Sequence, residues 1–474
     1  MHKILKHKPR VLVLAGMLAA LLPVASCSLV NIDPVTDPTN PSLESVITNA
    51  TQAQLNALAV GVEASIRLGH NNNGPNNWIT GTLGREIIVL ATNEPRWYQE
   101  ILGTRGTLDD NAFYSNAAYN GFARTIRASQ VFLASAQATS VISAQQQQGI
   151  AGFSHTYEAL AKLHMLDLQG ENGIRIDVAN YLKPGKFVTS AAALTNIRQL
   201  LDQAATELGG AGSAFAFPLS SGFAGFNTPV TFLKFNRALA ARVALYQGDN
   251  AGASAALALS FYDPAASLTL GPKIVYAPTV AGDAGNPYFQ VANGTQTGLV
   301  VAPTNFVTEA EAGDLRLAKA PLRTGPARTL GGIPSTYEVR VFPSQTTPLD
   351  IIRNEELILI SAETKAKSGN TAGAVADINV IRTRAGGLTA RTVASFTQPS
   401  DYIDEVLKQR RYSLFYEGHR WVDLRRLGRL TPGGVVSTGQ TLAYATGSNS
   451  AGTFKLFNNL ERPFAEKQWD IANP

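Results

Sequence analysis

Two short stretches of the sequence combine aromatic rings with planar amide groups. Residues 71–78 read NNNGPNNW, and residues 93–100 read NEPRWYQE. A sugar ring has an apolar face that an aromatic ring can cover, and a rim of hydroxyl groups that amides and a guanidinium can hydrogen-bond. The stretches therefore predict a saccharide-binding surface built from eight residues: Asn72, Asn73, Asn76, Asn77, Trp78, Arg96, Trp97 and Tyr98.

A second group of aromatic candidates lies in segment 274–292, which contains Tyr276 and Tyr288 together with Asn286 and Phe289. The alternative interpretation of the first group is a solvated asparagine-rich loop beside two tryptophans of the core. The sequence leaves both interpretations open for each single residue.

No catalytic motif can be recognised. The six histidines show no HExxH or other close metal-ligand spacing, and the sequence contains neither a GxSxG elbow nor a phosphate-binding loop. A glycosidase needs only two nearby carboxylates, and the 35 acidic residues leave that alternative open. We therefore expect a protein that is not an enzyme and that holds no metal ion and no cofactor.

The only cysteine, Cys27, follows a segment that is typical of an export signal. Residues 1–10 are basic, and residues 11–22 form an apolar run that is too short for a membrane span and suits a signal peptide. Small residues, Ala25 and Ser26, precede Cys27, as in the lipobox of bacterial lipoproteins. We expect residues 1–26 to be a signal peptide and Cys27 to be acylated; simple secretion is the alternative.

The formal charge of +5 comes mainly from this leader. Without residues 1–26, the balance of basic to acidic residues falls from 40 against 35 to 36 against 35. A nucleic-acid partner requires a concentrated basic surface, and a nearly neutral body gives little support for one. We expect no nucleic-acid partner.

Long helices must position the candidate residues. Apolar spacing and good helix formers predict helices over 44–67, 117–138, 145–168, 190–208, 230–247, 250–261, 353–368, 371–385 and 401–417. Segments 241–260 and 361–380 share one pattern, in which Gly248 or Gly369 ends a helix and Asp249 or Asn370 begins the next. This pattern predicts antiparallel helix pairs of the tetratricopeptide type in a mainly α fold.

The C-terminal run RRYSLFYEGHRWVDLRRLG, residues 410–428, resembles the signature of SusD/RagB-type outer-membrane lipoproteins. Its arginines, aromatic residues and acids favour a structural role over a nucleic-acid or catalytic site. We expect a packing corner, in which arginine–carboxylate pairs and aromatic stacking hold two helices together. Residues 354–386 resemble the family's helix pair that ends in N-x-[IV]-R-x-R-A-G, and residues 231–249 resemble another of its helix pairs. In segment 313–319, Leu315 replaces the proline of the family's D-P-R element.

The resemblance implies a tether over 27–43 and one SusD-like domain over 44–474. Helix pairs would occupy about 44–261 and 353–428, and the loop-rich segment 262–345 would help to form an irregular ligand face. It also implies a lipid-anchored protein on the surface of the outer membrane, which captures a glycan or peptide for a TonB-dependent, SusC-like β-barrel transporter. The alternative is a helical-repeat scaffold of the cell envelope without a small ligand.

Overall fold

The structure is a computed structural model of the chain. The predicted signal peptide, the tether with Cys27, and the candidates Asn72 and Asn73 lie outside the described residues, and they stay predictions. Among the described residues, no helix is long and apolar enough to cross a lipid bilayer. The structure describes residues 47–71, 74–104, 107–280, 282–326, 328–330, 333–334, 336–430, 435–437, 440–441 and 455–474.

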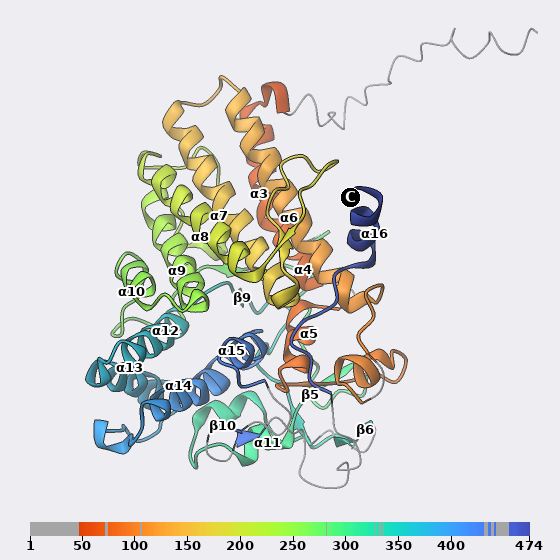
Figure 1. The fold of residues 1–474 in the computed structure, drawn as a ribbon, viewed down its shortest axis with the longest axis vertical. Coiled ribbons are helices and arrows are strands. Elements are labelled where there is room, and N and C mark those ends of the chain that lie inside the picture. Colours follow the sequence, from red (N-terminus) through yellow and green to blue (C-terminus); the bar gives the residue numbers. More distant parts are fainter. Residues whose placement is uncertain are drawn as a thin grey trace, which may run out of the picture. The chain divides into compact units, whose positions relative to one another are not determined.

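Six helices of the first half of the chain pack against one another in sequence order (Figure 1). They are α3 (Gln52–Ile66), α6 (Phe113–Ala138), α7 (Ala144–Gln169), α8 (Ser190–Gly209), α9 (Pro229–Gln247) and α10 (Asn250–Ala258). Two short helices, α4 (Leu68–Asn71) and α5 (Asn76–Leu83), lie between α3 and α6 in the sequence. Most of the buried apolar side chains of these helices belong to one continuous core.

Local sequence signals explain where several of these helices begin and how closely two of them pack. Ser143 and Gln146 form a reciprocal capping box at the start of α7, and the Thr189 side chain caps α8. Helix α9 starts with Pro229. Proline suits this first position, because a backbone N–H there would have no hydrogen-bond partner within the helix. Gly152 lets α7 approach α8, because a Cβ atom there would lie 2.6 Å from Leu208.

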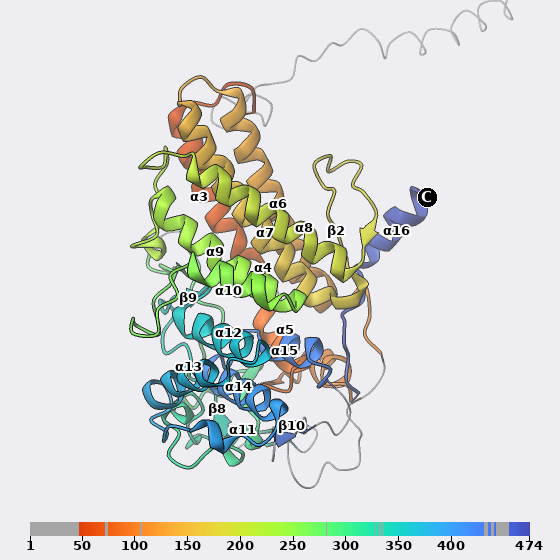
Figure 2. The same cartoon turned by 60° about the vertical axis from the view of Figure 1, so that its left-hand side comes forward.

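A second set of helices continues the stack next to α10, as the turned view shows (Figure 2). The set consists of α12 (Asn354–Lys367), α13 (Thr371–Arg384), α14 (Pro399–Ser413) and α15 (Arg420–Arg426). The two predicted turns are confirmed: Gly248 and Gly369 have φ angles of 74° and 78°, and the side chains of Asp249 and Asn370 cap α10 and α13. The predicted fold class, mainly α with paired helices and long loops, is also confirmed.

The remaining segments form loops and short strands around one small antiparallel sheet, in the order β1 (Ile88–Leu90), β5 (Leu299–Ala302) and β8 (Tyr337–Glu338). Val89 faces Val300, so the pairing joins the first hundred residues to the loop-rich segment. The other strands pair in twos: β2 (Ile174–Arg175) with β3 (Phe187–Val188), β4 (Lys273–Ile274) with β9 (Leu349–Asp350), β6 (Thr329–Leu330) with β7 (Ile333–Pro334), and β10 (Val435–Ser437) with β11 (Gln440–Thr441). Three short helical turns of this part matter below: η2 (Trp97–Ile101), α11 (Thr304–Thr308) and η5 (Leu315–Lys319).

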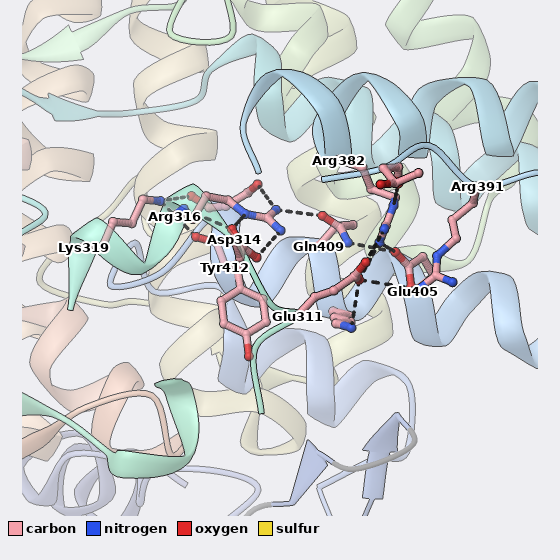
Figure 3. Close-up of polar contacts among 12 residues, drawn as sticks. Glu311, Asp314, Arg316, Lys319, Arg382, Arg391, Glu405, Gln409 and Tyr412 are labelled. Carbon is pink, nitrogen blue, oxygen red and sulfur yellow. Dashed lines mark hydrogen bonds and ion pairs between the residues drawn. The ribbon is translucent and has the colours of Figure 1, made fainter. Parts of the chain in front are cut away.

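A polar seam ties the loop-rich segment to α13 and α14 (Figure 3). Arg316 binds the Asp314 carboxylate at 2.7 Å and donates to the Gln409 side chain at 2.7 Å. Farther along the seam, Arg382 pairs with Glu311 and Glu405, each at 2.7 Å. Hydrogen bonds from Arg382 lower the pKa of Glu311 to about 2, so the carboxylate stays charged in the folded protein.

The signature segment forms a packing corner between α14 and α15. Trp421 is fully buried, and its indole N–H donates to the Phe457 carbonyl oxygen at 2.8 Å. Arg410 pairs with Asp423 at 2.6 Å, and Arg426 reaches Glu363 of α12 at 2.6 Å. These buried ion pairs hold Arg410, Asp423 and Arg426 of the motif within the fold.

A C-terminal strap, residues 455–460, crosses several distant elements before the last helix, α16 (Phe464–Ala472). The backbone of Lys455 donates to Gly103 at 2.8 Å, and the backbone of Leu460 donates to Leu168 at the end of α7 at 3.0 Å. Between these points, Phe457 accepts the hydrogen bond of the Trp421 indole. The strap therefore connects η2, α15 and α7.

Candidate ligand-binding site

Two of the predicted tryptophans line a cavity of about 480 Å³, which we call the aromatic pocket. Four parts of the chain surround it: the start of α5, the loop from β1 to η2, the start of α6, and the residues before β5. Its lining residues are Gly74, Pro75, Trp78, Ala91, Asn93, Glu94, Arg96, Trp97, Phe113, Thr297 and Gly298. The structure thus brings Trp78, Arg96 and Trp97 together, as the sequence led us to expect.

Strand pairing brings the distant segments of the pocket together. The register of β1 with β5 places Leu90 opposite Leu299, and the Gly298 backbone N–H donates to the Leu90 carbonyl at 3.2 Å. Thr297 consequently lies beside the loop that follows β1. Gly74 has a φ of 137°, and a Cβ atom there would lie 2.7 Å from the Phe113 ring, so glycine permits the close approach of the two walls.

Three rings form the apolar wall of the pocket. Trp97 is 6% exposed and lies between Trp78, at a centroid distance of 5.9 Å, and Phe113, at 5.1 Å. Trp78 is only half-buried, but its indole N–H is fully buried. Trp78 therefore offers the pocket a ring surface, and the two other rings hold that ring in place.

Polar side chains form the rim. Arg96 binds the Glu94 carboxylate through two hydrogen bonds, of 2.7 Å and 2.6 Å, and its guanidinium lies 4.9 Å from the centre of the Phe113 ring. The hydrogen bonds lower the pKa of Glu94 and raise the pKa of Arg96, so both groups are charged at neutral pH. Asn93 is exposed, and its amide makes no hydrogen bond to the described residues.

The pocket therefore combines an apolar ring, an amide that the described residues leave unbonded, and an ion pair with no net charge. This combination suits a ligand with an apolar face and a rim of hydroxyl groups. Among the described residues, no group of three or more His, Cys, Asp or Glu side chains could hold a metal ion.

The structure places two predicted asparagines in the interior, below the pocket. Asn76 and Asn77 are 4% and 2% exposed, and the Asn77 amide donates to the Tyr416 carbonyl oxygen at 3.0 Å. Tyr416 has a φ of 69°, which non-glycine residues rarely adopt, so this hydrogen bond supports an unusual turn. The Asn77 amide therefore supports the fold at the start of α5.

The predicted tyrosines also lie away from the aromatic pocket. Tyr288 is 1% exposed, and its hydroxyl lies 2.7 Å from Nδ1 of His70. Tyr276 is 4% exposed. Tyr98 is half-buried and packs against a separate apolar cluster that includes Ile88 and Leu299.

Eight other lining residues of the pocket were not among the sequence-based candidates, and three of these, Gly74, Pro75 and Ala91, lie in or near the two candidate stretches. Asn93 and Glu94 lie in the stretch that drew attention to Trp97, so a wider reading of that stretch could have found them. Nothing in the local sequence marks the other three, because only the tertiary fold brings them to the pocket: Phe113, Thr297 and Gly298.

Comparisons with known proteins bear on the family and on the fold. The family model of the SusD family matches residues 342–472, which confirms the resemblance of the C-terminal motifs. No curated protein sequence matches the chain.

Solved structures share the fold over most of the chain. A SusD superfamily protein from Bacteroides vulgatus superposes with a TM-score of 0.62 at 14% identity, covering 88% of this chain and 97% of that one. A SusD superfamily protein from Bacteroides thetaiotaomicron gives 0.60 at 17%, covering 80% and 89%. NanU of Bacteroides fragilis gives 0.58 at 17%, covering 86% and 95%. At these identities, the likeness establishes the fold.

Proposed function

We propose that this chain is a member of the SusD family and a nutrient-binding lipoprotein of the cell surface, as the match of its C-terminal region and the likeness of its fold support. It captures an oligomeric nutrient, for which we propose a glycan, and passes the nutrient to a TonB-dependent β-barrel transporter. It acts by binding and carries out no catalysis. Cys27 carries the lipid that anchors the protein to the outer membrane.

The aromatic pocket is the observation that carries this proposal. Trp78 presents a ring that is fixed by Trp97, and Asn93 presents an amide that the described part of the protein leaves free. A sugar ring stacked on Trp78 would keep its hydroxyl groups within reach of this amide and of the Arg96–Glu94 pair. The net charge of the pair is zero, which favours a neutral glycan over an acidic one.

Calorimetry with a panel of oligosaccharides and peptides tests the ligand class and the pocket together. We expect Trp78→Ala to weaken binding of the oligosaccharide about tenfold, which corresponds to about 1–2 kcal/mol for one aromatic contact. Tyr181→Ala is the matched control, because Tyr181 is an exposed aromatic residue that does not line the pocket. Unchanged affinity in Trp78→Ala, with a thermal melt like that of the wild type, would remove the aromatic pocket from the proposal.

Two further experiments test the anchor and the partner. Cells fed a clickable fatty acid should label the wild type but not the Cys27→Ala variant; equal labelling of both would refute acylation at Cys27. Affinity purification from the cell envelope should recover a β-barrel transporter. Recovery of many other envelope proteins without a transporter would instead support the scaffold alternative.

A further inference from the structure

A second cleft lies among the helices, and it shares no lining residue with the aromatic pocket. Its volume is about 550 Å³. The end of α7, the first turn of α8, the last turn of α9 and one side of α15 surround it. We call it the helical cleft and identify it by four of its residues: Asp167, Ala191, Tyr246 and Arg425.

Two polar groups of the helical cleft have no hydrogen-bond partner among the described residues. They are the carboxyl group of Asp167 and the hydroxyl group of Tyr246, and both side chains are half-buried. Burial raises the pKa of Asp167 to about 7, against the opposing effect of Arg425 and Arg242. Since no described residue forms a hydrogen bond with either group, both are available to hydrogen-bond an occupant of the cleft.

The arginines near Asp167 are already engaged elsewhere. Arg425 donates to the backbone carbonyls of Asp167 and Asn458, at 2.9 Å and 2.8 Å, and its guanidinium lies 4.7 Å from the Trp421 ring. Arg242 forms two hydrogen bonds with the Glu356 carboxylate, of 2.7 Å and 2.6 Å. Neither of these two arginines is therefore available to bind an anion in the cleft. The remaining polar groups of the cleft suit an uncharged ligand.

The rest of the lining supplies hydrogen-bond donors and a small apolar surface. Gln247 is exposed and Ser190 is half-buried, and neither side chain is hydrogen-bonded to the described residues. Leu194 and Val422 add apolar surface. A sugar unit matches this mixture, because its hydroxyl groups both donate and accept hydrogen bonds and its C–H groups need apolar contact.

From this arrangement, we propose that the helical cleft is a second binding site that takes one or two units of a neutral saccharide. The site is independent of the aromatic pocket, so a long glycan chain or two separate glycans can occupy the protein at once. Asp167 and Tyr246 hydrogen-bond the sugar hydroxyls, and Leu194 contacts the sugar ring.

Saturation-transfer NMR with maltose, cellobiose and lactose tests this proposal on the full chain in detergent. All measurements use the Trp78→Ala background, so that the aromatic pocket does not contribute. We expect at least one disaccharide to bind in this background, and we expect Ala191→Trp to abolish that binding by filling the cleft. Ala192→Trp is the matched control, since Ala192 is exposed on the same helical turn but does not line the cleft.

A second pair of variants tests the chemistry without adding bulk. Tyr246→Phe removes one hydroxyl group and should weaken binding roughly fivefold, as expected for the loss of one hydrogen bond. Tyr181→Phe removes an exposed hydroxyl elsewhere and should have no effect.

Two results would overturn the second site. One is the absence of binding by any of the three disaccharides in the Trp78→Ala background. The other is binding in that background that survives both Ala191→Trp and Tyr246→Phe. Neither result would count against the aromatic pocket, whose test compares Trp78→Ala with the wild type.

Discussion

Replacement of Trp421 by alanine should destabilise the protein strongly while leaving ligand affinity unchanged. The side chain is fully buried, so its removal leaves a cavity that costs about 3–5 kcal/mol. The Phe457 carbonyl loses its donor, and Arg425 loses the ring beneath its guanidinium, which adds about 1–2 kcal/mol in total. We therefore expect the free energy of unfolding to fall by about 4–7 kcal/mol.

Guanidinium unfolding followed by circular dichroism measures this loss as a shift of the midpoint multiplied by the slope of the transition. Trp421→Phe fills most of the cavity but removes the donor, so its loss should be clearly smaller than that of alanine. Calorimetry on both variants then reports ligand affinity under conditions where they remain folded. An unchanged unfolding midpoint combined with lost ligand binding would show that Trp421 belongs to a ligand site, and the packing corner would be wrong.

Three further predictions concern buried groups. Burial holds the pKa of His70 at about 4, below the 6.5 of an exposed histidine, so the unfolded chain binds the proton more strongly. The free energy of unfolding should fall by about 3 kcal/mol as the pH drops from 6.5 to 4. In thermal melts, the melting temperature of His70→Gln should depend less on pH than that of the wild type. Glu363→Gln removes a negative charge that balances the buried Arg426. The free energy of unfolding, measured with denaturant, should fall by about 3–5 kcal/mol. Gly152→Val should overpack α7 against α8 and cost about 1–3 kcal/mol, whereas Gly61→Ala, where a Cβ meets no atom within 4 Å, should be neutral or slightly stabilising by the same measurement.

The sequence predicted those parts of the fold that depend on neighbouring residues. Gly248 with Asp249, and Gly369 with Asn370, mark helix ends through backbone conformation and capping, and both effects act within a few residues. The helix pairs could therefore be located without knowledge of their partners.

The candidate site could be predicted only in part. The sequence does not show whether a given asparagine or tyrosine side chain will be buried in the core or exposed at a binding surface. Asn77 and Tyr288 form hydrogen bonds in the interior, while the Asn93 amide at the pocket rim makes none to any residue that the structure describes. Thr297 reaches the pocket only through the pairing of β1 with β5, and Asp167 meets Tyr246 only through helix packing. These contacts depend on register and packing over long sequence distances, which local patterns do not encode.

The C-terminal strap has a consequence for the time course of folding. Residues 455–460 are synthesised after α7, α15 and every other helix that they connect, yet they supply the carbonyl that accepts the Trp421 indole N–H. The corner of α14 and α15 can therefore close fully only after nearly the whole chain has been synthesised. A chain that ends before residue 455 lacks this acceptor and the backbone hydrogen bonds to Gly103 and Leu168, so only nearly complete chains can close the strap.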